Sequence, residues 1–540
     1  MNWRFAVTGA VSGVPASDPA GTVYVLTDDN TLQAIKPFSG TLIWSYRAKE
    51  PLTDTLMIGA DYTVYLYSKK NSLIAITPGG TVRWIRRFSS SLSHSPAASP
   101  EGSIILPLED GRLVKLNGRG QVQWEKNASY SYTAPVIDQD GSIYISGDQS
   151  VLYSYTPTGN QSWFYDMENQ AVQTAIWDDD LIAAAKGSLL SIGIDGVLNW
   201  LIDDMPFSEP VSIVASNNSM EVVYTDGTIV SLTSDGKVLQ TIAGPPTNGY
   251  ISKDENDALY LYGINKKLYR YFNNEIIEIE TETSMTPPLV GAAGNLFSGG
   301  ANWIVYCFNT PASALGWAGY RGGPLRNGAV DSGASLRRME NFYKNYKGYL
   351  FLQMMSESTE LEQRLDVLSD FQNLFRQNLL IEKYPFAPLL LISMAQEGIY
   401  QASYDGSSVS SNSSLIRIKA INLLGKIGDI RTRRFLINHL NQEKDASAAI
   451  SAMWALGRIG FDYDGEVTRS IARVKERFYN DDGVLLTICD TLEEIIYYNG
   501  IIPDQSGLHV LSSIYGSDAP PGIRRRSEEI FDKFTGGHNF

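Results

Sequence analysis

A tryptophan recurs along the first part of this chain at nearly constant spacing, and each copy follows a glycine by four residues. The five segments are GTLIWSY (40–46), GTVRWIR (80–86), GQVQWEK (120–126), GNQSWFY (159–165) and GVLNWLI (196–202). Their tryptophans are Trp44, Trp84, Trp124, Trp163 and Trp200, with steps of 40, 40, 39 and 37 residues. A fixed period of this length indicates a structural unit repeated along the chain, and it limits the possible folds more than any other feature.

The period extends beyond the five segments. Continued forwards it reaches Gln240, Glu278 and Trp317, and continued backwards it reaches Trp3. The residue four places earlier is glycine in the first six units and Asn274 or Ser313 in the last two. Glycine and asparagine tolerate a positive φ, so this position predicts a tight turn. The chain therefore holds eight units of about 39 residues, a length typical of a propeller blade.

Each unit contains short runs of β-branched and aromatic residues between polar turns, as in GTVYVLT (21–27) and GSIYISG (141–147). Four such strands per unit and eight units predict an all-β, eight-bladed propeller. In such a fold a tryptophan repeated once per blade is expected to lie buried between neighbouring sheets, with its indole N–H donated to a backbone acceptor. This role is predicted for Trp44, Trp84, Trp124, Trp163, Trp200 and Trp317.

The two ends of the repeat region predict how the ring closes. The last unit offers three strands, near 289–296, 302–308 and 312–319, and lacks a fourth. The chain begins with a spare strand, WRFAV (3–7). We expect this segment to be the outermost strand of the eighth blade, which would leave no open sheet edge.

The segment DGSIYISGDQSVLYSYTPTGNQSWFY (140–165) resembles the pyrroloquinoline-quinone-type propeller repeat, and LGWAGYRGGPLRNG (315–328) resembles a segment found beside such propellers. The resemblance covers residues 1–328 and implies a propeller whose tryptophans dock on adjacent blades. It leaves two functions open. One branch of the family comprises quinone- and calcium-dependent dehydrogenases, which commonly carry an adjacent cysteine pair. The other is non-enzymatic and binds partner proteins.

The residues favour the second branch. Cys307 is the only cysteine and His94 the only histidine of the propeller region, and no acidic run has the spacing of a calcium loop. We therefore expect no enzyme activity and no cofactor. The alternative is a quinone- or ligand-binding propeller, including a dehydrogenase-like enzyme.

After a small, polar linker (329–338) the hydrophobic period becomes helical. Residues 361–375 and 385–398 predict helices, and 404–414 predicts a loop. LLGKIGD (423–429) and ALGRIGF (455–461) repeat after 32 residues and resemble HEAT-like helical repeats, in which the glycines allow close helix crossing and a sharp turn. The predicted helical domain covers 339–515, and 516–540 is predicted to be a tail with one short helix.

Arg431, Arg433 and Arg434 form a basic cluster beside the turn of the first helical repeat. They are candidates for contact with an acidic partner or an anionic headgroup, and the alternative is a solvated helix start. His439 and His509 are isolated and lack the spacing of metal ligands. No nucleophile-elbow, zinc-protease or phosphate-loop motif is found in the sequence.

Composition sets the remaining expectations. A formal net charge of −15 over 540 residues disfavours nucleic acid as a partner, because the phosphate backbone would be repelled. The first residues lack the apolar stretch of an export signal, so we expect a periplasmic or envelope-associated protein if such a signal was removed, and otherwise a cytoplasmic one. The sequence predicts a protein-binding scaffold, in the bacterial envelope or an appendage such as the flagellum, with only indirect membrane association; it leaves the oligomeric state open.

Overall fold

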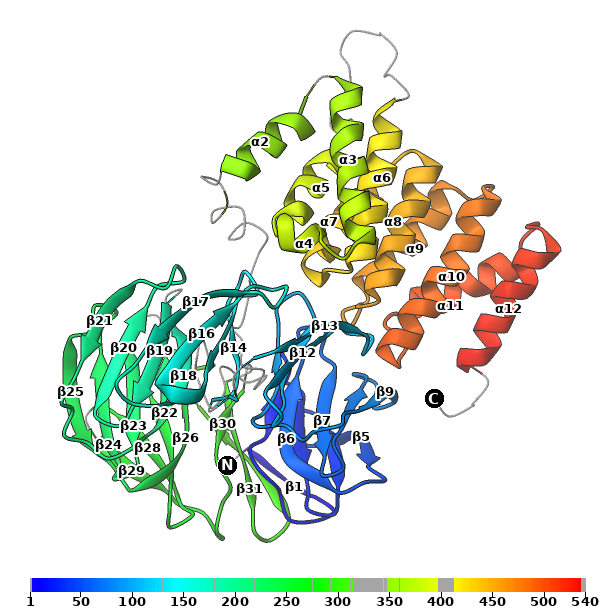
Figure 1. Ribbon diagram of the computed structural model, residues 1–540. Coiled ribbons are helices and arrows are strands. Elements are labelled where there is room, and N and C mark those ends of the chain that lie inside the picture. Colours follow the sequence, from blue (N-terminus) through cyan, green and yellow to red (C-terminus); the bar gives the residue numbers. More distant parts are fainter. Residues whose placement is uncertain are drawn as a thin grey trace. The chain divides into compact units, whose positions relative to one another are not determined.

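The computed structural model describes residues 2–128, 130–131, 133–177, 180–216, 219–273, 275–291, 294–310, 312–313, 343, 347–358, 360–396 and 412–535. The chain divides into two compact units, one built of strands and the other of helices (Figure 1). The linker predicted at 329–338, the segment 315–328, Trp317 and positions 404–411 of the predicted loop lie outside the described residues.

The strand unit is an eight-bladed propeller, and each blade is a four-stranded antiparallel sheet. The first blade is β2 (Ala16–Ser17), β3 (Val23–Leu26), β4 (Thr31–Ile35) and β5 (Leu42–Arg47), in that order from the inner to the outer edge. The next three blades are β6 (Leu52–Ile58), β7 (Val64–Ser68), β8 (Ser72–Ile76) and β9 (Val82–Arg87); β10 (Ala97–Ala98), β11 (Ile104–Pro107), β12 (Arg112–Leu116) and β13 (Val122–Asn127); and β14 (Val136–Ile137), β15 (Ile143–Ser146), β16 (Val151–Tyr155) and β17 (Gln161–Asp166).

The other blades repeat the order. The fifth to seventh are β18 (Ala171–Trp177), β19 (Asp180–Ala185), β20 (Ser188–Ile192) and β21 (Leu198–Ile202); β22 (Pro210–Ala215), β23 (Met220–Tyr224), β24 (Thr228–Leu232) and β25 (Val238–Ala243); and β26 (Thr247–Lys253), β27 (Leu259–Gly263), β28 (Leu268–Phe272) and β29 (Glu275–Ile279). The middle strands of each blade are nearly all buried on both faces, since each sheet packs between two neighbours.

The eighth blade joins the two ends of the strand unit. Its order is β30 (Leu289–Val290), β31 (Asn295–Gly300), β32 (Ile304–Asn309) and β1 (Trp3–Ala6), with β1 outermost, as predicted (blue beside green in Figure 1). The strand predicted near 302–308 is β32, shifted by one to two residues, whereas the region near 289–296 holds β30 and the start of β31. The strand predicted near 312–319 lies mostly outside the described residues.

Short polar turns explain where several strands begin. Asp18 accepts hydrogen bonds from the backbone N–H of Thr22 at 2.9 Å and from the Tyr24 hydroxyl at 3.0 Å. Asp254 accepts from the N–H of Ala258 and from the Tyr260 hydroxyl in the same way. One carboxylate thus closes the turn and satisfies a buried tyrosine on the following strand. Burial raises the pKa of Asp18 despite these hydrogen bonds.

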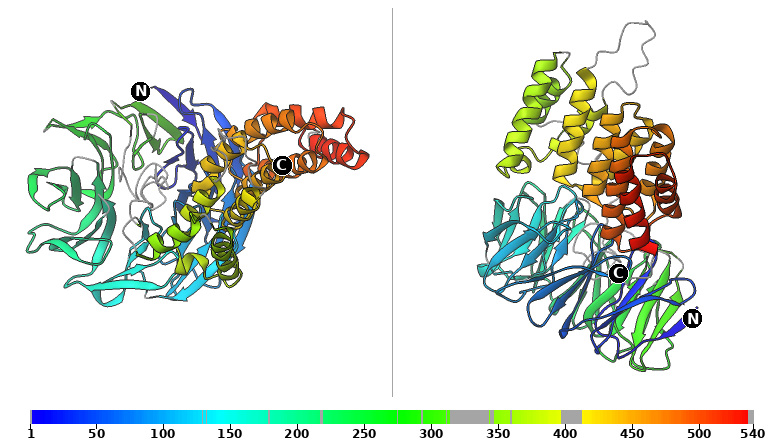
Figure 2. Two further views of the ribbon diagram at one scale, coloured as in Figure 1. Left: turned by 90° about the horizontal axis from the view of Figure 1, so that it is seen from above. Right: turned by 90° about the vertical axis from the view of Figure 1, so that its right-hand side faces the viewer.

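The helical unit has two layers of stacked helices (Figure 2). It begins with α2 (Lys347–Ser356), α3 (Leu361–Arg376), α4 (Leu380–Lys383) and the largely buried α5 (Ala387–Gln396). Three helix pairs follow: α6 (Asn412–Ile427) with the short η2 (Ile430–Thr432) and α7 (Arg433–Gln442), α8 (Ala446–Ile459) with α9 (Glu466–Arg477), and α10 (Asp482–Asn499) with α11 (Gln505–Tyr515). Helices α6, α8 and α10 pack side by side, as do α7, α9 and α11.

The repeated glycines of this unit have separable roles. A Cβ at Gly425 would lie 2.7 Å from the Cα of Ala455, so this glycine allows α6 and α8 to cross closely. Gly428 and Gly460 have φ of 71° and 79° and end their helices. Gly457 has more room, because its nearest neighbour, a methyl of Thr491, would lie 3.4 Å from an added Cβ.

Two details of the sequence predictions for the helical unit were wrong. Residues 412–414 begin α6 rather than ending a loop. The helix predicted in the tail 516–540 is present as α12 (Pro521–Thr535), but it is 15 residues long and buries Ile523, Ile530 and Phe534 against α10 and α11.

Deleting residues 1–10 should lower the melting temperature of the propeller and promote self-association. The deletion removes β1 and exposes the edge of β32, which then offers unpaired backbone groups to other chains. Differential scanning calorimetry and light scattering would measure both effects.

Arg4→Ala is the matched control, because Arg4 is on the same strand but forms only an exposed ion pair with Glu282 at 3.9 Å. A deletion variant that melts like the wild type would contradict closure by β1.

Candidate functional site

The repeated tryptophan connects neighbouring blades. The indole Nε1 of Trp84, on β9 of the second blade, donates to the carbonyl oxygen of Gly118 in the third blade at 3.0 Å. The same bond recurs around the ring, from Trp124 to Pro157 at 2.9 Å, from Trp163 to Ile194 at 2.9 Å and from Trp200 to Ser234 at 2.8 Å.

The glycine of the motif receives the tryptophan of the preceding blade. An added Cβ at Gly120 would lie 2.6 Å from Cδ2 of Trp84, and Gly159, Gly196 and Gly236 stand in the same relation to Trp124, Trp163 and Trp200. These glycines also have positive φ, 76° at Gly120. Two independent requirements therefore fix glycine here: the turn geometry and the approach of an indole ring.

Within their own blades, Trp44 and Trp84 each lie across an alanine from a tyrosine. Tyr24, Ala34 and Trp44 are paired across β3, β4 and β5, and the rings of Tyr24 and Trp44 are 5.8 Å apart. Tyr65, Ala75 and Trp84 repeat this row in the second blade, with ring centroids 5.9 Å apart. The small central residue lets the two rings meet over the strand between them.

Trp3 fills the eighth position of the ring. It pairs with Cys307 on β32, donates its N–H to the carbonyl of Pro37 in the first blade at 2.6 Å and lies on Gly40. The backward extension of the period had already reached Trp3, and the role predicted for Trp317 lies outside the described residues. The same contact explains Cys307, which is the small residue between Trp3 and Phe297.

The described indoles are mostly but not fully buried, in agreement with the prediction, since they belong to the outermost strand of each blade. They lie at the outer edge of the disc, away from the innermost strands that line its centre. Their role is to hold blades together.

Gly120→Ala should destabilise the propeller by about 2–5 kcal/mol, because the variant combines a strained positive φ with a clash against Trp84. Gly187→Ala is the matched control: Gly187 has a φ of 87°, but nothing lies within 4 Å of an added Cβ. Denaturant unfolding of the propeller would measure both.

In the Trp84→Ala background the cost of Gly120→Ala should fall to that of Gly187→Ala, since the clashing ring is gone. Equal costs for the two glycine variants in the wild-type background would contradict the docking role.

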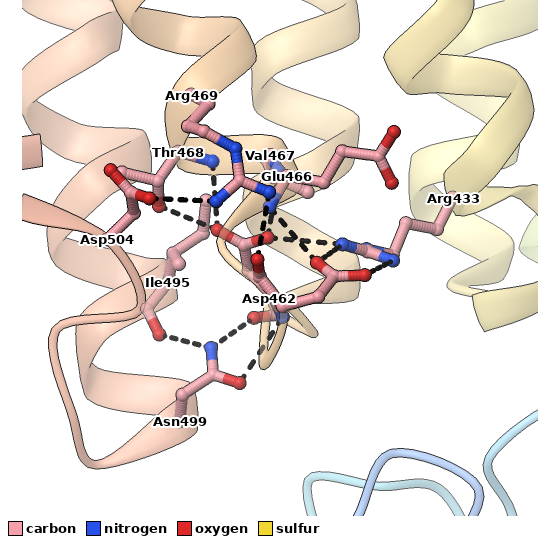
Figure 3. A network of polar contacts seen from close by, with 11 residues as sticks. Arg433, Asp462, Glu466, Val467, Thr468, Arg469, Ile495, Asn499 and Asp504 are labelled. Carbon is pink, nitrogen blue, oxygen red and sulfur yellow. Dashed lines mark hydrogen bonds and ion pairs between the residues drawn. The ribbon is translucent and has the colours of Figure 1, made fainter. Parts of the chain in front are cut away.

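In the helical unit a buried carboxylate organises the turn between α8 and α9 (Figure 3). Asp462 is fully buried and accepts hydrogen bonds from the backbone N–H of Val467 and Thr468, each at 2.8 Å, and from the Thr468 hydroxyl at 2.6 Å. Arg433 of the preceding helix pair reaches Asp462 with Nη2 at 3.1 Å. Burial raises the pKa of Asp462, while these bonds and Arg433 oppose the rise.

A similar ion pair joins the next two helix pairs. Arg469 of α9 donates to Asp504, the N-cap of α11, at 2.7 Å. Hydrogen bonds from Ser506 and the ion pair with Arg469 lower the pKa of Asp504 to about 2. An arginine of one helix pair thus holds the turn aspartate of the next, which fixes the spacing of the pairs.

Two of the three arginines predicted to bind a partner form ion pairs within the helical unit. Arg431 donates to Asp429 at 2.7–3.1 Å, and Arg433 pairs with Asp462 and Asp464. Both guanidinium groups therefore stabilise turns. Arg434 is the exposed member of the cluster.

A second buried group joins α6 to the end of α7. Glu443 lies 3.1 Å from Nε of Arg417 and 3.1 Å from Nε2 of the fully buried His439, and it accepts from the N–H of Asp445. Burial alone would raise the pKa of Glu443, but the His439 contact, the backbone N–H and the charge of Arg417 together lower it to about 2.

This pKa predicts acid sensitivity. The folded protein binds the Glu443 proton less tightly than the unfolded chain, whose ordinary value is 4.5, so the carboxylate stabilises the helical unit above pH 4.5 and the contribution is lost as pH falls towards 2. Glu443→Gln should lower the melting temperature at pH 7 and lose less stability over this range than the wild type. Helical circular dichroism would measure it.

The exposed Glu476 on α9 supplies the control, Glu476→Gln, which should behave like the wild type. An unchanged pH profile in Glu443→Gln would contradict the assignment.

Other chemistry-bearing groups were searched in the described part of the chain. There, no cluster of three or more histidine, cysteine, aspartate or glutamate side chains could hold a metal ion. Burial raises the pKa of the Cys307 and Cys489 thiols to about 12 and about 11, so both are protonated at neutral pH. Among the described helices, none is both long and apolar enough to cross a bilayer.

Residues 2–186 match the family described as outer membrane protein assembly factor BamB. The match covers the first four blades, part of the fifth and β1, and it confirms the sequence-based resemblance to that class of propeller repeat. A search of curated proteins found no match.

Solved structures similar to this chain include BamB from Moraxella catarrhalis, with 15% identity, 57% of this chain and 98% of that chain covered, and a TM-score of 0.47. Sqt1 from Saccharomyces cerevisiae has 12% identity, coverage of 57% and 98%, and a TM-score of 0.49. The computationally designed Ika8 protein has 14% identity, coverage of 56% and 98%, and a TM-score of 0.49. Likeness at this level says nothing about function.

Proposed function

We propose that this protein is a non-enzymatic scaffold that binds other proteins in a bacterial envelope or appendage assembly, for example a flagellar one. The observation that carries the proposal is the match of residues 2–186 to the family of an outer membrane protein assembly factor. The envelope placement rests on that match alone.

Many polar and aromatic side chains connect neighbouring structural elements, which supports the scaffold role. Trp84 and its counterparts connect blades, Asp462 and Asp504 connect helix pairs, and Glu443 joins two helices. These interactions make both units rigid. Rigid repeat units suit binding by shape, because little conformational freedom is lost when a partner docks. We interpret α6 to α11 as HEAT-like pairs on this basis.

Two units on one chain suit a bridging role. Once a partner binds one unit, the other unit is present at a high effective concentration for a second contact. Each single contact can therefore be weak. We therefore expect that stable partner recovery requires the strand unit and the helical unit together.

The test is cross-linking followed by affinity purification from native cells with the full chain, with 1–330, with 339–540 and with the two fragments mixed. Circular dichroism would first confirm that each fragment is folded. The full chain should recover partners that neither fragment retains. Recovery of the complete partner set by 1–330 alone would contradict the two-unit role.

The alternative enzymatic function has its own test. The purified protein, incubated with pyrroloquinoline quinone and calcium, should show no alcohol or sugar oxidation and no retained quinone absorbance. Turnover would overturn the scaffold proposal itself.

A further inference from the structure

The helical unit has a second basic surface, on the layer formed by α6, α8 and α10. On α6, Leu415, Lys419, Asn422 and Lys426 follow one another at steps of four, three and four residues, so they share one helix face. Leu415, Lys419 and Lys426 are exposed and Asn422 is half-buried. From Leu415 to Lys426 this face of α6 is therefore largely open to solvent.

The exposed face of α8 continues this surface. Ile450 and Trp454 lie on that face, and Trp454 is 37% exposed although tryptophan is usually well covered. An added Cβ at Gly425 would lie 2.9 Å from Cζ3 of Trp454, so the indole reaches over α6 beside Lys426. We call Leu415, Lys419, Lys426, Ile450 and Trp454 the basic–apolar face.

The surface extends towards α10. Ile450 Cδ1 would lie 3.2 Å from a Cβ at Gly483, and Leu486, one helical turn further along α10, is 43% exposed. Apolar side chains thus follow one another across three neighbouring helices.

The charge of this face is not neutralised by its own fold. Helix α6 carries Arg417, Lys419 and Lys426 and no carboxylate, and α8 carries Arg458 and no carboxylate. Arg417 is used internally by Glu443. For Lys419 and Lys426, no ion pair is found among the described residues.

Helix α10 carries four carboxylates, and two of them pair with α12. On α10, Asp490 pairs with Arg526 of α12 at 3.0 Å, and Glu493 pairs with Arg526 and with Lys533. Asp490 and Glu493 are therefore engaged by α12, whereas Asp482 and Glu494 of α10 are exposed. In a chain of net charge −15, the charged residues of the basic–apolar face itself are both lysines.

We propose that the basic–apolar face binds an acidic protein segment that inserts an apolar side chain beside Trp454. The proposal rests on the scaffold function and specifies the partner chemistry. Lys419 and Lys426 favour carboxylates, and burial of the exposed Trp454 and Leu415 supplies the apolar contact, tryptophan being a frequent anchor of protein interfaces.

An anionic membrane or a nucleic acid fits this face less well. Membrane-binding clusters typically hold about four to eight lysines or arginines, and this face offers fewer. The net charge of −15 opposes approach to any extended phosphate surface. Two lysines around an apolar centre suit a short acidic segment instead.

The experiment selects random 15-residue displayed peptides on the full-length protein. Selected peptides should be enriched in aspartate and glutamate around a leucine or an aromatic residue. A representative synthetic peptide should bind the Lys419→Glu/Lys426→Glu variant at least about tenfold more weakly by fluorescence anisotropy. Trp454→Leu should weaken binding by a similar factor.

The matched control is Arg434→Glu/Arg473→Glu, which changes the net charge equally on exposed positions of α7 and α9. It should bind the peptide as the wild type does. Unchanged melting temperatures would show that all variants are folded. Because the lysines have no ion pair and Trp454→Leu keeps an apolar side chain, at least one variant should fold normally.

Three results would overturn the proposal: peptides without acidic enrichment, equal binding to the two double variants, or lysine-dependent binding to phosphatidylserine vesicles in place of peptides. The first two leave the scaffold function standing, because partners could still bind elsewhere. The scaffold function fails separately, through quinone-dependent turnover.

Discussion

The docking of one tryptophan on the glycine of the next blade is the contact on which the strand unit depends. Five indoles donate their N–H to a backbone carbonyl across the blade boundary and lie against a glycine where a larger residue would clash, as Trp84 does at Gly118 and Gly120. The contact is local to two blades, so it can be repeated without any change in the rest of the sheet. A ring follows when the last blade meets the first.

Closure depends on the same contact formed by residues far apart in the sequence. Trp3 sits on β1 beside Cys307 and docks on Gly40 of the first blade. Strand β1 therefore completes the eighth sheet and also provides the tryptophan that contacts the first blade. This arrangement links the stability of the ring to the first ten residues.

In the helical unit, neighbouring repeats are joined by ion pairs instead of aromatic rings. Arg433 and Arg469 each reach from one helix pair to the turn aspartate of the next, Asp462 and Asp504. The charged residues that look most available for binding in sequence are thus engaged within the fold. Solvent-facing lysines on α6, together with Trp454, remain for an acidic partner, and this shift of the candidate surface from α7 to α6 and α8 follows from the side-chain contacts alone.

The sequence by itself determined the repeat, the number of blades, the outermost place of β1 and the helical character of the second half, because turn and strand signals are local and recur at a fixed period. It also predicted the Gly-x-x-x-Trp contact as one between blades. Only the tertiary structure decided that Trp3 fills the eighth position, that Arg431 and Arg433 are paired, and that α12 belongs to the core. Each of these features depends on contacts between side chains that are far apart in the sequence, and the periodicity of the sequence does not specify such contacts.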